Sequence, residues 1–353
     1  MQIFRNTGEQ DRRNAEQSFV LGERSLRAYL AGGNVRFLED AESNFSVLDP
    51  KDRRYDDARF YLAVTKVQLR KADESIDILS KLRKRKATER IPNTDLENKI
   101  ALQLAYAHIK KYTDEDYKAA EKELCDLRKV ASDSENRELL VQTKAIQVFM
   151  YSVMAGRFGD KEKNPADFAR RPDYARKALE LGEDLLKTAR SFIEVRFEAL
   201  NSLGITWMWI AAGQWNAEPR WNELGEPLAS CTKAQNYYDQ ALTIIPNSVR
   251  VLQNVTRLRL LQVKHDFPKD RSVLLAEAKE YVLRSLEVND QDQYPFYELA
   301  QIAVKQGDPK AAWENIHIGR TRPGAVKEKE WAKVEQDANA LAANVAPEAQ
   351  TQA

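Results

Sequence analysis

Cysteine and histidine are scarce in this chain of 353 residues, which contains two cysteines and three histidines. Cys125 and Cys231 lie far apart in the sequence, so neither a disulfide framework nor a thiolate metal site is indicated. None of His108, His265 and His317 has a second His or Cys at the spacing that two metal ligands on one helix require. We therefore expect no metal, no cofactor and a reducing compartment.

Glycine and proline are also few, with 13 and 12 residues. A sandwich or barrel of many strands needs more turn residues than this, so the composition favours helices. The longest apolar run, residues 205–212, is far shorter than a membrane-spanning helix, and the first residues lack the apolar core of a signal peptide. These absences predict a soluble, cytoplasmic protein without a membrane segment.

Neither sign of charge is in excess, because 55 Lys and Arg stand against 54 Asp and Glu, for a net charge of +1. Nucleic-acid-binding proteins usually carry a marked basic excess, so this balance argues against that class. The chain also lacks the short motifs of zinc proteases, phosphate-binding loops, serine hydrolases and dinucleotide-binding folds. We therefore expect that it is not an enzyme.

The apolar residues that are present recur at steps of three and four, as in Leu26, Tyr29 and Leu30, which is the helical pattern. Breaks at glycine and proline divide the chain into helices that form seven antiparallel pairs and one last helix, an arrangement that favours a stacked array. The predicted helices are 11–31, 34–48, 53–70, 73–86, 94–111, 114–131, 135–157, 166–170 continuing as 173–189, 191–212, 232–245, 248–265, 271–288, 293–306, 309–320 and 325–343. The tail at 344–353 is predicted to be disordered.

Two of the predicted pairs carry the same spacing of large and small residues. In the last pair the pattern consists of Phe296, Leu299, Ala300 and Ala303, then Gly307, then Ala312, Ile316, Gly319 and Pro323. In the fifth pair it consists of Leu200, Leu203, Gly204 and Trp207, then Ala234, Tyr238, Ala241 and Pro246. This spacing resembles the tetratricopeptide repeat (TPR). Small residues let two helix backbones approach closely, and bulky residues fill the space between repeats.

The TPR resemblance is stronger toward the C-terminus. Residues 1–190 resemble degenerate TPR-like repeats, for which an irregular all-helical solenoid of another kind is the alternative. Residues 191–343 are better-matching repeats, with an insertion at 214–232 inside the fifth pair and a capping helix at 325–343. The resemblance implies an all-α fold: an α-solenoid of about seven antiparallel helix pairs in a right-handed superhelix, closed by the capping helix.

A TPR superhelix binds peptides or protein segments on a concave surface that the first helix of each pair lines, and the resemblance implies the same here. Mapping the motif places on that surface Asn201, Trp209, Arg250, Asn254, Arg257, Tyr294, Tyr297 and Gln301. The arginines suit a carboxylate, asparagine can bond both groups of an extended backbone, and tyrosine offers amphipathic surface. A merely solvated helix face would also show the stripe Arg250, Asn254 and Arg257, and we favour the groove. The carboxylate clamp of chaperone adaptors would need basic residues where Tyr294 and Glu298 stand, so chaperone-tail binding is not expected.

Two further features lie outside the repeat pattern. Trp215 and Trp221 are in the insertion, where they either contact a partner or fold back onto their own helix stack. A dense basic cluster at 81–90 contains Lys81, Arg83, Lys84, Arg85, Lys86 and Arg90. It suits phosphate or an acidic partner, but cations that favour the C-terminal end of a helix dipole also explain it, and we favour that interpretation.

The function that these features predict is a protein–protein interaction scaffold or adaptor, which holds a partner protein or peptide segment of unknown identity in the concave groove. The alternative is a regulatory or sensor subunit that clamps and controls an effector enzyme, of the bacterial signalling or defence type. Nucleic-acid binding through residues 81–90 is a third hypothesis. In any of these roles the chain can be one subunit of a larger complex.

Overall fold

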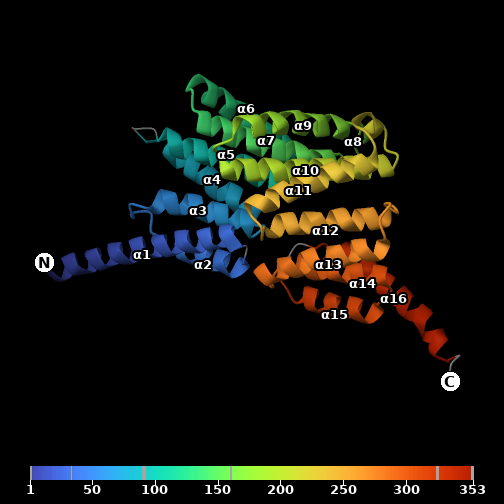
Figure 1. Cartoon of the computed structure of the whole chain (residues 1–353). Helices are drawn as coiled ribbons and strands as arrows, with labels where there is room; N and C mark the ends of the chain where they lie inside the picture. Colours follow the sequence, from blue (N-terminus) through green and yellow to red (C-terminus); the bar gives the residue numbers. More distant parts are fainter. Residues whose placement is uncertain (1, 33, 90–92, 160, 323–325, 351–353) are drawn as a thin grey trace. The chain divides into compact units, whose positions relative to one another are not determined.

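The computed structural model describes residues 2–32, 34–89, 93–159, 161–322 and 326–350, and every regular element in these ranges is a helix (Figure 1). The helices are α1 (Gln2–Gly32), α2 (Val35–Ser46), α3 (Tyr55–Gln68), α4 (Ala72–Lys86), α5 (Thr94–Lys111), α6 (Asp114–Asp133), α7 (Arg137–Arg157), α8 (Pro165–Phe168), α9 (Arg171–Thr188), α10 (Ile193–Trp215), the 3-10 helix η1 (Trp221–Leu224), α11 (Pro227–Ile244), α12 (Val249–Lys264), α13 (Arg271–Val288), α14 (Gln293–Gln306), α15 (Pro309–Arg320) and α16 (Glu328–Gln350). Within these ranges no helix has the length and apolar character needed to cross a bilayer.

Most predicted helix ends agree with these bounds within a few residues, but three ends differ. Helix α1 begins at Gln2 instead of 11, α11 begins at Pro227 instead of 232, and α16 reaches Gln350 instead of 343. Proline suits the first turn of α11 because its fixed φ is helical and its missing N–H is not needed there. Alanine, the strongest helix former, is frequent through 338–343 and favours continuation of α16. Residues 351–353 of the predicted disordered tail lie outside the described residues.

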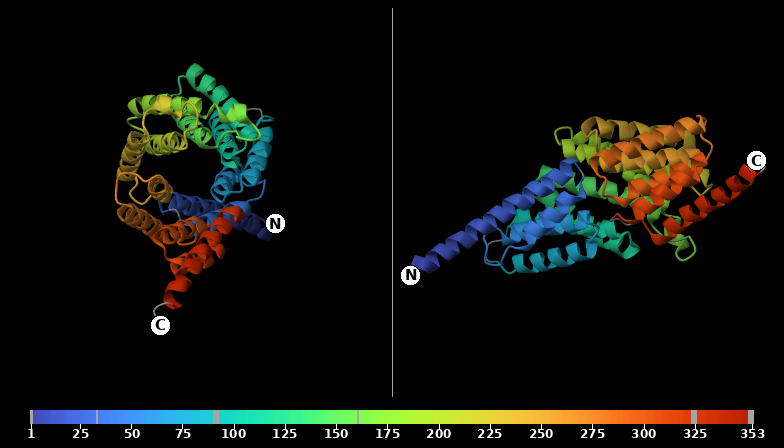
Figure 2. Two further views of the ribbon diagram at one scale, coloured as in Figure 1. Left: turned by 90° about the vertical axis from the view of Figure 1, so that its right-hand side faces the viewer. Right: turned by 90° about the horizontal axis from the view of Figure 1, so that it is seen from below.

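The chain forms two compact units: Met1–Ala31 with Val35–Trp209 (unit 1), and Gly32–Asn34 with Ile210–Ala353 (unit 2). Helices that follow one another in the sequence pack side by side from α2 to α7 in unit 1 and from α11 to α16 in unit 2 (Figures 1 and 2). First helices of neighbouring pairs touch as well, as α3 touches α5 and α12 touches α14. This stacking of helix pairs is an all-α solenoid. The predicted domain boundary between residues 190 and 191 separates degenerate from better-matching repeats and does not describe compact units. It stays a prediction.

Aromatic rings fill the first part of the core of unit 1. The ring centroids of Phe19 on α1 and Phe45 on α2 are 6.0 Å apart, and Tyr61 on α3 stacks on Phe45 at 5.7 Å. Gly22 lets α1 approach α2, because a Cβ at this position would lie 2.7 Å from the Phe45 ring. Each buried ring of this kind stabilises the fold by about 2 kcal/mol.

The repeat positions of the last pair are buried in unit 2, as close helix packing requires. Ala300 and Ala312 are fully buried between α14 and α15, and a Cβ at Gly319 would lie 2.5 Å from the Trp331 ring. Helix α16 packs against both α14 and α15 and buries Trp331, Val334 and Ala338. These residues belong to the apolar stripe of the predicted capping helix, so α16 covers the end of the helix stack in unit 2.

Candidate partner-binding site

Two of the ten predicted site residues, Asn201 and Trp209, belong to unit 1. Asn201 is only 2% exposed, so it is a core residue and the prediction that it faces a partner is corrected. Trp209 is half-buried, and its indole lies against Gly156 of α7 so closely that a Cβ there would clash with it. Both side chains therefore serve the packing of unit 1.

Trp221, in the insertion, is 2% exposed and packs inside unit 2. Its ring covers Gly213 at the end of α10, where a Cβ would lie 2.5 Å from the ring, and its Nε1 donates a hydrogen bond to the Glu218 carboxylate at 2.9 Å. An indole that is enclosed in this way is not available to a partner. The burial of Trp221 favours the interpretation in which this part of the insertion folds back on its own helix stack.

A buried glutamine anchors the rest of the insertion. Gln214, 7% exposed, donates from Nε2 to the carbonyl of Gly225 at 2.6 Å and accepts from the Ser230 hydroxyl at 3.0 Å. Gly225 has a φ of +120°, a conformation that side-chain-bearing residues rarely adopt. These contacts hold the segment between α10 and α11 in one conformation.

Trp215 remains partly accessible and stacks on His265, with ring centroids 4.9 Å apart and planes inclined by 5°. His265 follows the last residue of α12, so this stack joins the ends of α10 and α12 within unit 2. Burial, together with the charge of Lys264, lowers the pKa of His265 and favours the neutral imidazole.

Two polar contacts fix α12 against α14 in unit 2. Gln253 Nε2 donates to the Asp292 carboxylate at 3.3 Å, and the same carboxylate caps α14 by accepting from the backbone N–H of Tyr294 at 3.2 Å. Further along both helices, Arg257 of α12 reaches Glu298 of α14, and the Arg257 Nε lies 3.3 Å from the Glu298 Oε1. The register of the two helices thus places arginine and glutamate face to face.

The Arg257 guanidinium is surrounded by three side chains, which with it form what we call the Arg257 site. Besides Glu298, the ring of Tyr294 lies 5.2 Å from the guanidinium carbon, and Asn254 Oδ1 lies 3.5 Å from one terminal nitrogen. The Arg257 side chain nevertheless remains 39% exposed. Because guanidinium carries five N–H donors in a fork, it can hold these neighbours and still present donors to a ligand.

Glu298 is the unusual member of this site because its side chain is 2% exposed and neither carboxylate oxygen makes a well-directed hydrogen bond. Burial raises the pKa of Glu298 to about 8, although Arg257 acts in the opposite direction. Burial thus favours the neutral form of this carboxyl group, and a neutral carboxyl group does not cancel the positive charge of Arg257. The sequence places Glu298 on this helix face, but no pattern in it signals the burial.

The remaining predicted residues have different surroundings. Tyr297 packs its ring edge-to-face on Trp331 of α16 at 5.3 Å, and its hydroxyl accepts a hydrogen bond from Gln301 at 2.7 Å. Burial raises the pKa of Tyr297 to about 12. Asn254 is 8% exposed, whereas Arg250, one turn earlier on α12, is exposed. The predicted stripe on α12 is thus not uniformly exposed, and the prediction of a continuous row of ligand-facing side chains is wrong at Asn254. The accessible cations of the stripe are Arg257, at the Arg257 site, and Arg250, two turns earlier on α12.

The basic cluster at 81–90 is largely neutralised by carboxylates within unit 1. Its ion pairs are Lys81–Asp77 at 2.7 Å, Arg83–Glu123 at 2.7 Å, Arg85–Asp56 at 3.3 Å and Lys86–Asp56 at 3.1 Å. Lys86 is itself buried. Arg90 lies outside the described residues. Cations that already have carboxylate partners offer a weak phosphate site, so these contacts favour a structural role for the cluster.

Groups with catalytic or metal-binding chemistry are dispersed. In the described part of the chain, no three His, Cys, Asp or Glu side chains gather in a way that would hold a metal ion. His108 Nδ1 lies 2.7 Å from the Asp116 carboxylate, which also holds the side chain of Thr113 at 2.6 Å. Burial raises the pKa of the Cys231 thiol to about 12, which makes this side chain unreactive.

No family profile matches the chain, and no curated protein sequence matches it significantly. Similar solved structures include the human IFIT1 dimer with m7Gppp-AAAA (16% identity, 90% of this chain and 74% of that chain covered, TM-score 0.39). The TPR domain of P58(IPK) is 13% identical over 94% of this chain and 99% of that one, with a TM-score of 0.25. The APC/C hetero-tetramer Cut9-Hcn1 is 12% identical over 96% and 82%, with a TM-score of 0.22. The class of the chain, an all-α helical-repeat protein, follows from its own stacked helix pairs.

Proposed function

We propose that this chain is a non-enzymatic scaffold that holds a partner protein or peptide segment at the Arg257 site, against the surface of α12 and α14. The group that the site would recognise is a carboxylate, from an acidic side chain or from a chain terminus. The observation that carries the proposal is a guanidinium that remains 39% exposed beside a buried carboxyl group, whose pKa is raised by that burial.

The physical support lies in charge and preorganisation. An arginine whose charge is not cancelled attracts a carboxylate, and a charge-assisted hydrogen bond of this kind contributes about 1.5–3 kcal/mol. The Tyr294 ring and Glu298 restrict the guanidinium before a ligand arrives, so less side-chain entropy is lost on binding. Tyr294 also supplies amphipathic surface beside the charge.

Site-specific photo-crosslinking of the full chain in its native cells tests the proposal. A photoreactive phenylalanine analogue replaces Tyr294, and crosslinked peptides are identified by mass spectrometry. Tyr281 on α13 is a matched control position, because it is also half-buried and also lies beside an arginine, Arg284, at 5.6 Å. We expect one partner segment, containing a carboxylate, to crosslink from position 294 and not from position 281.

A second variant connects the crosslink with the arginine. Arg257→Gln removes the charge but keeps a polar side chain of similar length, and circular dichroism checks that helix content is retained. We expect this substitution to abolish the crosslink from position 294. A crosslink that persists in Arg257→Gln, or that forms equally from positions 294 and 281, would contradict the proposal.

A further inference from the structure

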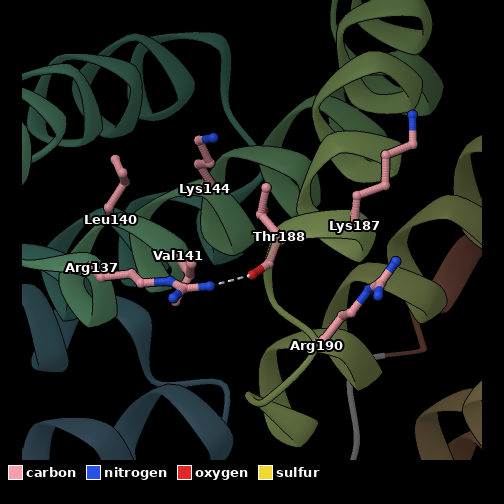
Figure 3. A pocket seen from close by; sticks show the side chains of 7 residues that line it. All are labelled: Arg137, Leu140, Val141, Lys144, Lys187, Thr188 and Arg190. Carbon is pink, nitrogen blue, oxygen red and sulfur yellow. Dashed lines mark hydrogen bonds between the residues drawn. The ribbon is translucent and has the colours of Figure 1, made fainter.

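A pocket of about 330 Å³ lies wholly within unit 1, between the start of α7 and the end of α9. Its lining consists of Arg137, Leu140, Val141, Lys144, Lys187, Thr188 and Arg190 (Figure 3). The volume is at the lower end of the range of about 300–1,000 Å³ that is typical of ligand sites. We call it the Arg137 pocket.

The rim of the Arg137 pocket carries four cations and no acid. Lys144 pairs with Asp184 at 2.8 Å, and Arg137 donates a hydrogen bond to the carbonyl of Thr188 at 3.0 Å (Figure 3). Among the described residues, no carboxylate pairs with Arg137, Lys187 or Arg190. Three uncompensated cations around one small cavity repel one another, and an anion that enters the cavity relieves this repulsion.

The stability of α7 does not explain the position of Arg137, whose hydrogen bond to Thr188 places its charge at the C-terminal end of α9. Arg137 is the first residue of α7, where the positive end of the helix dipole disfavours a cation by about 0.3–1 kcal/mol. The N-terminal end of α7 and the rim cations contribute positive potential at the mouth of the pocket, and the partial negative charge at the C-terminal end of α9 offsets only part of it. Arg137, Val141 and Lys144 also stand at helical spacing, which is the signal from which sequence analysis could have found the pocket.

The floor of the pocket is aliphatic. Val141 is 3% exposed and Leu140 is half-buried, and the lining contains no aromatic ring. Sites for nucleobases usually stack the base on an aromatic side chain, which is missing from this lining. An aliphatic floor instead suits an aliphatic side chain, whose burial is favourable.

We propose that the Arg137 pocket binds an acidic peptide segment, with an aliphatic side chain on the floor and flanking carboxylates paired with the rim cations. The partner is thus a protein with a short motif of one aliphatic residue among acidic residues. This site is in a different unit from the Arg257 site and does not depend on the function proposed for it.

Fluorescence anisotropy with the full chain tests this inference. The probe is a labelled five-residue peptide with a central leucine between two aspartates on each side, and its partner probe has glycine in place of leucine. The variant Lys187→Glu with Arg190→Glu reverses two exposed rim charges. The control, Lys118→Glu with Lys122→Glu, makes the same change in net charge at exposed positions of the first half of α6, which runs antiparallel to α7.

We expect the rim variant to bind the leucine peptide at least tenfold more weakly than the native chain, and the control less than twofold more weakly. The glycine peptide should bind about fivefold more weakly than the leucine peptide, because it leaves the floor uncovered. The neutral variant Lys187→Gln with Arg190→Gln, which lacks any new repulsion, should lose about threefold, and thermal melts confirm that all variants fold.

Three results would overturn the inference. The first is equal loss in the rim variant and the control, which would mean general charge attraction. The second is equal affinity for the leucine and glycine peptides. The third is a single-stranded oligonucleotide that binds more tightly than the peptide and displaces it, which would assign the pocket to nucleic acid.

Discussion

Replacing Glu298 by glutamine should stabilise unit 2 at neutral and alkaline pH. The folded state holds the proton of Glu298 up to a pKa of about 8, whereas the unfolded chain loses it near the ordinary value of 4.5. Between these values the folded state binds more protons than the unfolded state, so the free energy of unfolding falls as pH rises. The stabilisation of the folded state by the proton on Glu298 is fully present below pH 4.5 and is lost as pH rises through about 8. Glutamine has nearly the same shape and does not titrate.

The size of the effect follows from the difference between the two pKa values. Each unit corresponds to about 1.4 kcal/mol, so the native chain should lose about 3 kcal/mol between about pH 5 and pH 8, relative to the glutamine variant. Comparing the two proteins at the same pH removes the contributions of other titrating groups. His265 is one of these, but its pKa is lowered, so it acts below 6.5 and in the opposite direction.

Hydrogen-exchange mass spectrometry of the full chain is the suitable assay, because local opening of α12 and α14 can be followed in peptides that cover 249–264 and 293–306. Intrinsic exchange rates cancel between variants at one pH. Glu280→Gln, at an exposed position of α13, serves as the control and should give the same pH profile as the native chain. If native and Glu298→Gln chains kept a constant difference in protection from about pH 5 to pH 8, the assignment of a raised pKa to Glu298 would be refuted.

Three further changes test the packing. Gly213→Ala places a methyl group 2.5 Å from the Trp221 ring and should lower the free energy of unfolding of unit 2 by about 1–3 kcal/mol in urea titrations, whereas an unchanged midpoint would contradict the close contact. Gln214→Ala leaves the buried hydroxyl of Ser230 without this partner and should cost about 1–3 kcal/mol and increase proteolysis within 214–232; equal digestion would show that the insertion is not anchored there. Burial raises the pKa of Asp116, but its hydrogen bonds lower this pKa by more, so the net shift is downward. The stabilisation of the fold by the Asp116 carboxylate is therefore present above pH 3.8 and is lost in acid. Asp116→Asn should therefore destabilise unit 1 at pH 7, with the difference shrinking below pH 3.8 in thermal melts, and a difference independent of pH would refute this.

The helices and the repeat positions were predictable because they depend on local order. Apolar residues at helical spacing define each buried face, and alanine at positions such as Ala300 and Ala312 follows from the close approach of two helices. Helix ends were less predictable at the two ends of the chain, where α1 begins earlier than expected and α16 continues past Pro347.

The state of the candidate site was not predictable, because it depends on contacts between helices that are distant in the sequence. Glu298 and Arg257 are 41 positions apart, and only the register of α12 against α14 determines that one is buried and the other half-exposed. Trp221 is of a residue type that is frequent in binding sites, but it is enclosed by Gly213 of α10 and by Glu218 of its own insertion. Residue type alone does not distinguish an indole that binds a partner from one that closes a turn.

The most direct test of the central claim is the affinity of the crosslinked partner segment, made as a synthetic peptide, for three full-length chains by isothermal titration calorimetry. These are the native chain, Arg257→Gln, and Lys279→Gln as a charge-matched control at an exposed position of α13. We predict that Arg257→Gln weakens binding about tenfold or more, in line with the loss of a charge-assisted hydrogen bond, and that Lys279→Gln changes it less than twofold. Equal affinity of all three chains for the segment would contradict a carboxylate-binding role for Arg257.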